Sequence, residues 1–286
     1  IDVLVVQSNK SSFLINVRLF TSSILTKQYI QNACIKQPAI HCYDQIIYIH
    51  ENLENINNVI LTLFDLLGGK YMKIFFCTIP MNDPQGIKTV EYSFFGDERK
   101  KDIVVTTKFP AIAMLKTNLK ADDDFEIVIM WTDKPLKSDE NSQFTDSVTN
   151  LNSFYEELDC LSNELGMNLK EKTREIIIPF DESSGKQILT FKMICNSFVK
   201  DSEVYMDLTY GTKMSIINEF ASVTYAEKAC SCYIKEMIYG SFDFGKTAKA
   251  TIFDIRTLYE MSALIQSASN IPDIDITRIF DMYEEE

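Results

Sequence analysis

The chain has 286 residues, of which 46% are hydrophobic and 24% are charged, and its formal net charge is −13. This composition is typical of a globular protein, and no apolar run reaches the roughly 18 residues that a membrane span requires. The acidic balance excludes broad, sequence-independent binding of DNA or RNA, which needs a basic surface, but it leaves room for a small anionic ligand held by a few local groups.

Residues 1–70 are predicted to form a small α/β unit. Residues 1–6 and 13–20 have the composition of strands around a polar turn, residues 44–50 form a further apolar run, and residues 51–67 have helical spacing. The role of this unit is open: it fits the remainder of an effector domain, an oligomerisation element, or extra strands on a larger sheet.

From residue 72 onward the sequence alternates between strand-like and helix-like segments. Residues 81–102 are a polar stretch, and residues 133–150 are interpreted as a surface loop. Buried strands are predicted at 71–80, 124–133, 175–180 and 203–211, and helices at 109–119, 153–169, 187–199 and 214–227. Such an alternation predicts an α/β fold: a Rossmann-like, mostly parallel sheet with helices on both faces.

The C-terminal part follows a different pattern. Residues 229–240 and 248–256 are predicted to pair as a hairpin, and residues 257–270 have helical spacing. We therefore place one ligand-binding domain over residues 72–270, followed by an acidic tail at 271–286.

The seven cysteines are odd in number and irregularly spaced, and several lie in apolar runs, which is typical of buried free thiols in a reducing cytoplasm. Cys230 and Cys232 are spaced like half of a metal site, but no second pair and no nearby histidine completes it. His41, Cys42 and His50 are interpreted as structural. We expect neither a metal ion nor a cofactor.

Two loops are the candidates for a ligand site, because ligands in open α/β sheets bind beyond the C-terminal ends of the strands. They are residues 78–85 after the first buried strand and residues 209–215 after the fourth. In the second loop Gly211 permits a tight turn, the start of the next helix offers free N–H groups, and Lys213 adds a positive charge. The loop matches neither G-x-x-x-x-G-K-[ST] nor G-x-G-x-x-G, so mononucleotide hydrolysis and dinucleotide binding are not supported.

These residue types predict binding of a phosphate or a nucleotide, but three other interpretations stay open. The loop has the composition of a strand-to-helix turn with a capping threonine. An α/β enzyme with a phosphate-containing substrate would need a further set of acid and base residues, and none is evident. A nucleotide-sensing transcription regulator would need a basic helix-turn-helix, which the acidic composition disfavours.

The segment D-L-T-Y-G-T-K-M-S at 207–215 resembles the signature D-x-T-x-G-T-K-x-M of the CRISPR-associated Rossmann-fold (CARF) family of sensor domains. The methionine arrives one position early, at Met214, and Tyr210 stands where glycine or histidine is common. The agreement covers Asp207, Thr209, Gly211, Thr212 and Lys213. The layout of residues 72–270, with a terminal hairpin and a last helix, is also similar.

The resemblance implies a cytoplasmic homodimer that binds a ring of 3′–5′ linked adenylates, with cyclic tetra-adenylate as the expected ring, and controls an effector in type III CRISPR antiviral signalling. Neither duplex nucleic acid nor a membrane is an expected partner. An alternative is a self-contained ring nuclease that uses metal-independent attack by a ribose 2′-hydroxyl, with Lys213 as the catalytic residue.

The resemblance also implies a set of ligand-binding residues, in which the loop after the first buried strand lines the base or ribose. Trp131 borders the pocket in this interpretation, or is a core aromatic in the alternative one. The expected residues are Thr78, Ile79, Pro80, Asn82, Trp131, Thr132, Thr209, Tyr210, Gly211, Thr212, Lys213 and Ser215. No arginine precedes either histidine at the spacing of the usual ribonuclease effector, and Glu98-Arg99-Lys100 in a polar loop is a poor nuclease motif.

Overall fold

The computed structural model describes residues 3–9, 12–18, 71–97, 99–133, 145–242 and 250–268. The chain divides into two compact units, residues 1–69 with 264–286 and residues 70–263. In the first, β1 (Val3–Asn9) and β2 (Ser12–Arg18) pair as an antiparallel hairpin, and both strands extend into the polar turn predicted at 7–12. The predicted strand at 44–50, the helix at 51–67, the histidines and the acidic tail lie outside the described residues.

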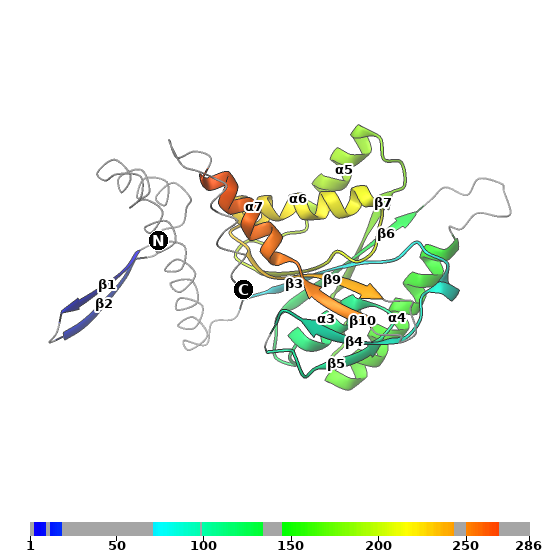
Figure 1. The fold of residues 1–286 in the computed structure, drawn as a ribbon, viewed down its shortest axis with the longest axis horizontal. Coiled ribbons are helices and arrows are strands. Elements are labelled where there is room, and N and C mark those ends of the chain that lie inside the picture. Colours follow the sequence, from blue (N-terminus) through cyan, green and yellow to red (C-terminus); the bar gives the residue numbers. More distant parts are fainter. Residues whose placement is uncertain are drawn as a thin grey trace. The chain divides into compact units, whose positions relative to one another are not determined.

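The second unit is built on an eight-stranded sheet with the order β5-β4-β10-β9-β8-β3-β6-β7 (Figure 1). Five of its seven pairings are parallel and two are antiparallel, which confirms the predicted α/β class. The strands are β3 (Lys73–Thr78), β4 (Val90–Phe95), β5 (Val104–Thr107), β6 (Phe125–Asp133), β7 (Thr173–Pro179), β8 (Glu203–Asp207), β9 (Tyr233–Phe242) and β10 (Ala250–Asp254).

Helices cover both faces of this sheet and create two separate hydrophobic cores. Strand β3 serves both, because Phe75 packs into the core with α3 and α4, while Ile74 and Phe76 pack into the core with α5 and α6. A continuous apolar run is what a strand buried on both faces requires. The helices are α3 (Pro110–Asn118), α4 (Thr145–Leu165), α5 (Ser184–Cys195), α6 (Lys213–Cys230) and α7 (Arg256–Ala268), with the short 3₁₀ turns η1 (Pro84–Gly86) and η2 (Lys170–Lys172).

Two sequence-based interpretations are wrong in part. The polar stretch at 81–102 contains η1 and β4, and β5 follows it. In β4 the buried residues Val90, Tyr92 and Phe94 alternate with more exposed residues, so the strand does not form a continuous apolar run in the sequence. The surface loop predicted at 133–150 gives way to helix α4 from Thr145, whose first two turns bury mainly the polar side chains of Ser147 and Asn150.

The strand order reverses between β3 and β8. From β3 the parallel strands proceed through β6 to β7 on one side, and through β8 to β9 on the other. At such a switch point the connections leave toward opposite faces and open a crevice at the C-terminal ends of the strands. Both candidate loops, after β3 and after β8, flank this point. Strand β10 pairs antiparallel with β9. On its other side β10 pairs parallel with β4, and β5 pairs antiparallel with β4 at the edge of the sheet.

Candidate functional site

The turn between β8 and α6 is shaped by one glycine and one capping threonine. Gly211 has a φ of +111°, and a Cβ atom there would lie 2.5 Å from Ser215 Oγ and 3.1 Å from Thr78 Cγ2. Thr212 caps the helix, since its Oγ1 accepts a hydrogen bond from the Ser215 amide at 3.0 Å. Ser215 is buried and donates its Oγ–H to the Thr212 carbonyl at 2.9 Å. Only glycine therefore fits position 211 without displacing its neighbours.

Helix α6 offers an anion-binding end to solvent. Lys213 is its first residue and is exposed, and the first turn carries no acidic residue that would compete for the lysine or the helix amides. The helix is 18 residues long, so its N-terminus carries the full partial positive charge of the aligned peptide dipoles. This arrangement suits a phosphate group better than a neutral ligand.

Asp207, the last residue of β8, anchors the turn from inside the protein. It is fully buried, and its Oδ1 accepts hydrogen bonds from the Thr209 amide at 2.9 Å and from the Thr209 hydroxyl. The hydroxyl oxygen of Thr209 accepts in turn from the Gly240 amide of β9 at 2.8 Å. Burial raises the pKa of Asp207 to about 7, although the Thr209 hydrogen bonds oppose the shift. Its Oδ2 has no partner among the described residues.

Asp207 makes stability depend on pH in a predictable direction. Its folded pKa of about 7 lies above its ordinary value of 3.8, so its stabilising contribution is full below about pH 4 and is lost as the pH rises through 7. Asp207→Asn keeps the Oδ1 acceptor and cannot ionise. We expect wild type to lose stability relative to this variant by up to about 1.4 kcal/mol per pH unit between roughly pH 5 and 7, measured by urea unfolding.

The matched control for this pH series is Asp102→Asn, at an exposed position. Because this side chain is exposed, the change tests for effects of removing a carboxyl that do not depend on burial. A pH-independent difference for Asp207→Asn would show that the carboxyl is already ionised in the folded protein.

Glu219 is a second buried carboxyl at the site, and the sequence analysis did not identify it. It lies on the inner face of α6 with no exposed surface, and its Oε2 accepts a hydrogen bond from Thr78 Oγ1 at 3.1 Å. Burial raises the pKa of Glu219 well above its usual range; the Thr78 hydrogen bond opposes the shift, and the Asp207 charge adds to it. The pair joins the end of β3 to α6 and thereby connects the two candidate loops. Helical spacing could have identified this residue, because Glu219 lies four positions after Ser215 and therefore on the same, buried face of α6.

The loop after β3 is mostly inside the protein. Ile79 and Pro80 are buried, and the Ile79 amide donates to the Met130 carbonyl at 2.8 Å. The side-chain amide of Asn150, on α4, donates to the carbonyls of Pro80 at 3.0 Å and Asn82 at 2.9 Å. Of the four residues predicted from this loop, only Asn82 is exposed. The other three shape the loop from beneath.

Trp131 and Thr132 lie at the end of β6, on the far side of β3 from β8. The Trp131 Nε1–H donates to Glu175 Oε2 at 2.8 Å, and the Tyr155 hydroxyl donates to Glu175 Oε1 at 2.6 Å. Thr132 is buried. The indole of Trp131 also packs against the core beneath α3 and α4, which favours the interpretation of this tryptophan as a core-edge aromatic.

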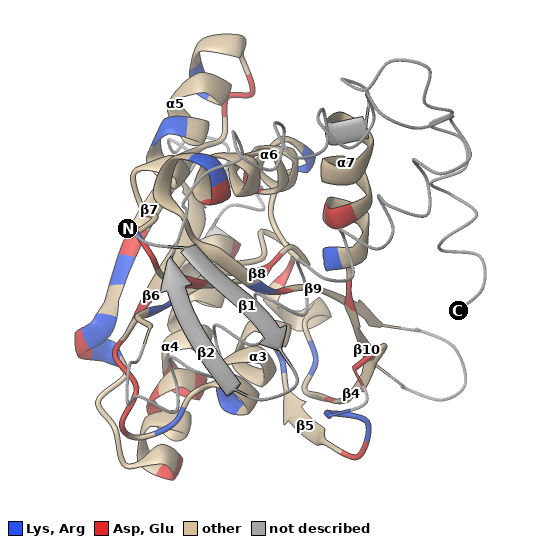
Figure 2. Ribbon diagram, turned by 90° about the vertical axis from the view of Figure 1, so that its left-hand side faces the viewer, with Lys and Arg blue, Asp and Glu red and all other residues tan. Residues whose placement is uncertain are grey.

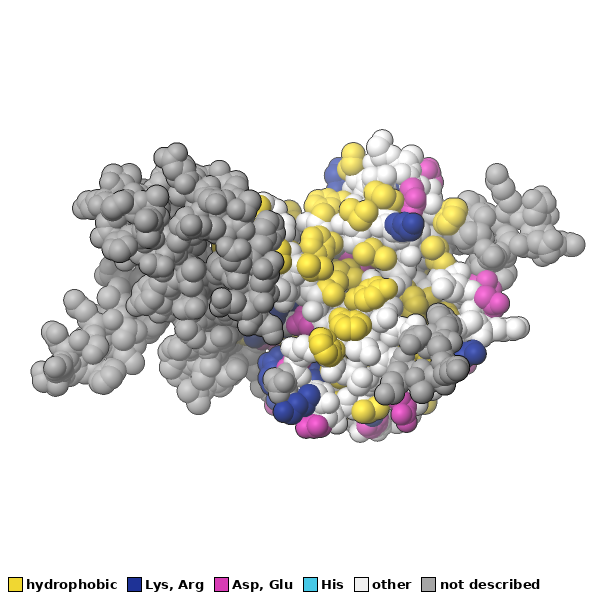
Figure 3. All heavy atoms as spheres, in the orientation of Figure 1, with side chains coloured by type: hydrophobic (Ala, Val, Ile, Leu, Met, Phe, Trp, Pro, Cys, Tyr) yellow, Lys and Arg dark blue, Asp and Glu magenta, His cyan; other side chains and the backbone are white. Residues whose placement is uncertain are grey.

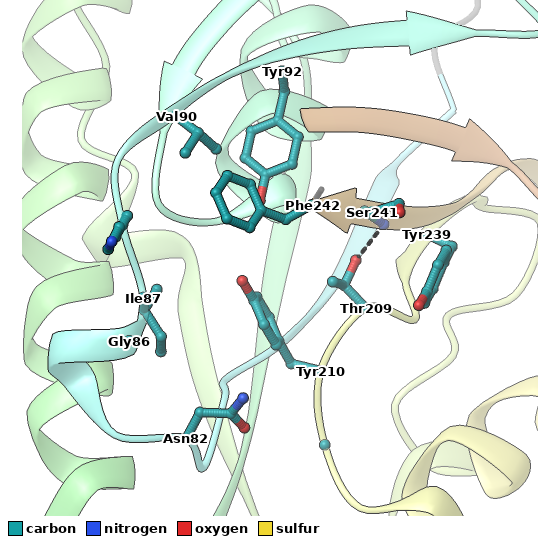
Figure 4. Close-up of a pocket in the computed structure, with 13 residues that line it drawn as sticks. Asn82, Gly86, Ile87, Val90, Tyr92, Thr209, Tyr210, Tyr239, Ser241 and Phe242 are labelled. Carbon is teal, nitrogen blue, oxygen red and sulfur yellow. Dashed lines mark hydrogen bonds between the residues drawn. The ribbon is translucent and has the colours of Figure 1, made fainter. Parts of the chain in front are cut away.

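A pocket of about 320 Å³ opens beside the β8–α6 turn (Figure 4). The turn itself forms one wall, η1 and β4 form a second, and the end of β9 forms a third. Of the twelve predicted residues, four line it: Asn82, Thr209, Tyr210 and Gly211. The remaining lining comes from residues that the sequence analysis did not select: Gly86, Ile87, Lys88, Val90, Tyr92, Tyr239, Gly240, Ser241 and Phe242.

Other candidate sites have structural explanations. Within the described ranges there is no group of three or more His, Cys, Asp and Glu side chains able to hold a metal ion, and no helix long and apolar enough to cross a membrane. Cys232 is buried and its thiol donates to the Val199 carbonyl at 3.2 Å. Lys100 is buried in an ion pair with Glu236, with Nζ and Oε1 2.6 Å apart, as expected of a structural group.

Basic and acidic positions are interspersed along the described ribbon, so the site gains its positive character locally, from Lys213 and the helix end (Figure 2). No model of a known protein family matches the chain, and a search of curated proteins also finds no match.

Proposed function

We propose that this protein is a cyclic oligoadenylate sensor of the CARF type, acting in the cytoplasm as a homodimer in type III CRISPR antiviral signalling, with cyclic tetra-adenylate as its ligand. The observation that carries the proposal is the position of the D-L-T-Y-G-T-K motif. Its residues form the turn at the switch point of the sheet, with Lys213 exposed at the start of α6.

The geometry favours this function over a simple structural turn. A capped strand-to-helix turn requires only Gly211 and Thr212. Such a turn does not require an exposed lysine in a first helical turn that lacks acidic residues. Nor does it require a position beside a pocket, at the crevice where α/β sheets bind their ligands.

A two-fold dimer also fits the ligand chemistry. A cyclic tetra-adenylate carries four phosphates and has rotational symmetry, so two copies of the α6 N-terminus can face one ring. Exposed apolar side chains are present on the surface for such an association. Figure 3 shows hydrophobic side chains gathered on the face that carries α5 and α6, and the exposed residues of these helices include Ile188, Leu189 and Ile217.

The test is a calorimetric titration of cyclic tri-, tetra- and hexa-adenylate into the purified protein, followed by chromatography of the recovered nucleotide. We expect one ring of cyclic tetra-adenylate to bind per two chains and to be recovered intact. Linear fragments would instead identify a ring nuclease. No heat with any ring, from a folded protein, would refute the proposal and leave an anion-binding turn.

A further inference from the structure

We infer that the pocket beside the β8–α6 turn takes a single adenine base with its ribose, from a ligand whose phosphate lies on the N-terminus of α6. The inference rests on the proposed function and deepens it, because it assigns the base to residues outside the D-L-T-Y-G-T-K motif. Two of the three pocket walls come from η1 with β4 and from the end of β9.

The pocket is continuous with the N-terminal end of α6. Thr209, Tyr210 and Gly211 line the pocket, and α6 begins two residues after Gly211. A ligand with its phosphate on the helix amides therefore has this pocket as an adjoining cavity. Among the described residues that line the pocket, Lys88 is the only charged one, and its positive charge favours a neighbouring phosphate.

The walls of the pocket are rich in aromatic side chains. Tyr92, Tyr210, Tyr239 and Phe242 contribute rings, and in Figure 4 Tyr210 points toward Tyr92 and Phe242, with Val90 and Ile87 across the pocket. Aromatic faces stack on nucleobases. Apolar walls of this kind, with a few polar groups among them, are typical of small-molecule sites.

Tyr92 and Tyr210 form a rigid part of the lining. The Tyr210 hydroxyl donates to the Lys108 carbonyl at 3.4 Å, and its ring packs against the hydrophobic core. Tyr92 is buried, and burial raises its pKa to about 12, so the pair stays neutral at physiological pH. A fixed, neutral aromatic wall is preorganised for stacking and loses little conformational entropy on binding.

The pocket is also small. Its volume of about 320 Å³ is at the lower end of the range for ligand sites, which suits one nucleoside. The described lining includes the polar side chains of Asn82, Ser241 and Thr209. A side-chain amide can pair with both N6 and N7 of adenine, which gives Asn82 a means of selecting this base.

The experiment combines two probes, adenosine 5′-monophosphate followed by saturation-transfer NMR and cyclic tetra-adenylate followed by calorimetry. Phe242→Ala and Asn82→Ala alter the pocket, and Phe95→Ala, at an exposed position of β4 outside the lining, is the matched control. We expect saturation transfer to the adenine protons in wild type. We also expect Phe242→Ala to weaken ring binding by about fivefold or more, the low end for base stacking, and Phe95→Ala to leave it unchanged.

The outcomes separate this inference from the proposed function. Ring binding that is unaffected by Phe242→Ala and Asn82→Ala would overturn the inference while the sensor proposal stands. Saturation transfer from the monophosphate that is lost in Phe242→Ala, with no ring bound, would support the adenine pocket and refute the sensor. Failure of both probes to bind folded wild type would overturn both.

Discussion

Lys213→Ala is expected to weaken the binding of cyclic tetra-adenylate by roughly two to four orders of magnitude. A hydrogen bond to a charged group contributes about 1.5–3 kcal/mol, which corresponds to about 10- to 150-fold in affinity. In the proposed dimer two lysines face one ring, so the factor applies twice. Because Lys213 is exposed and the Thr212 cap is unaffected, the variant should fold as stably as wild type.

The control for this prediction is Lys228→Ala, which removes the same charge from the other end of the same helix. Calorimetry of both variants separates a local contact from the overall field of a protein with net charge −13. Equal, small losses in the two variants would mean that the lysine acts only through long-range attraction. A loss confined to Lys213→Ala, reduced at high salt, is the expected result.

Gly211→Ala is expected to destabilise the protein by about 2–5 kcal/mol, the combined cost of a disfavoured φ and of overpacking. The new Cβ would lie 2.5 Å from Ser215 Oγ. Ser215 is buried and bonded to the Thr212 carbonyl, so its hydroxyl can move away only by breaking that bond. The change would also displace the start of α6 and weaken the proposed binding of the ring.

Substitutions at two other glycines separate the cost of the positive φ from the cost of the steric overlap of the new Cβ. Gly166 also has a positive φ, of +67°, but a Cβ there has no heavy atom within 4 Å, so Gly166→Ala should cost only about 1 kcal/mol. Gly185 has neither constraint, and Gly185→Ala should be close to neutral. Urea unfolding of the three variants measures the series. A cost for Gly211→Ala no larger than that for Gly166→Ala would show that the turn rearranges freely.

The parts of this fold that could be predicted are those with local signals. Strand β3 is a run of apolar residues because it serves two cores, and Gly211 with Thr212 marks the start of α6 through backbone and capping preferences that act within a few residues. The alternation of such segments was enough to predict the α/β class and the loops that flank the switch point.

The parts that could not be predicted depend on contacts between distant residues. Strand β4 is only half apolar, and its pairing with β10 joins Tyr92 to Ala250. Glu219 looks like an ordinary helical acid until the fold brings Thr78 against it. Trp131 was selected for its rarity, but its bond to Glu175 arises from the β6–β7 pairing. The pocket is likewise built largely from the unpredicted strand and the end of β9.

The pairing of β4 with β10 has a consequence for how the chain matures. The β4–β5 pair is synthesised early, but its place in the sheet is beside β10, one of the last strands made. Contacts of such long sequence separation form slowly, and an unpaired strand edge invites wrong partners in the meantime. During translation the residues of the β8–α6 turn are therefore made before β10, the strand that positions β4 as the opposite wall of the pocket. A chain that ends before residue 250 keeps the residues of the β8–α6 turn and lacks β10, the strand that holds β4 opposite them.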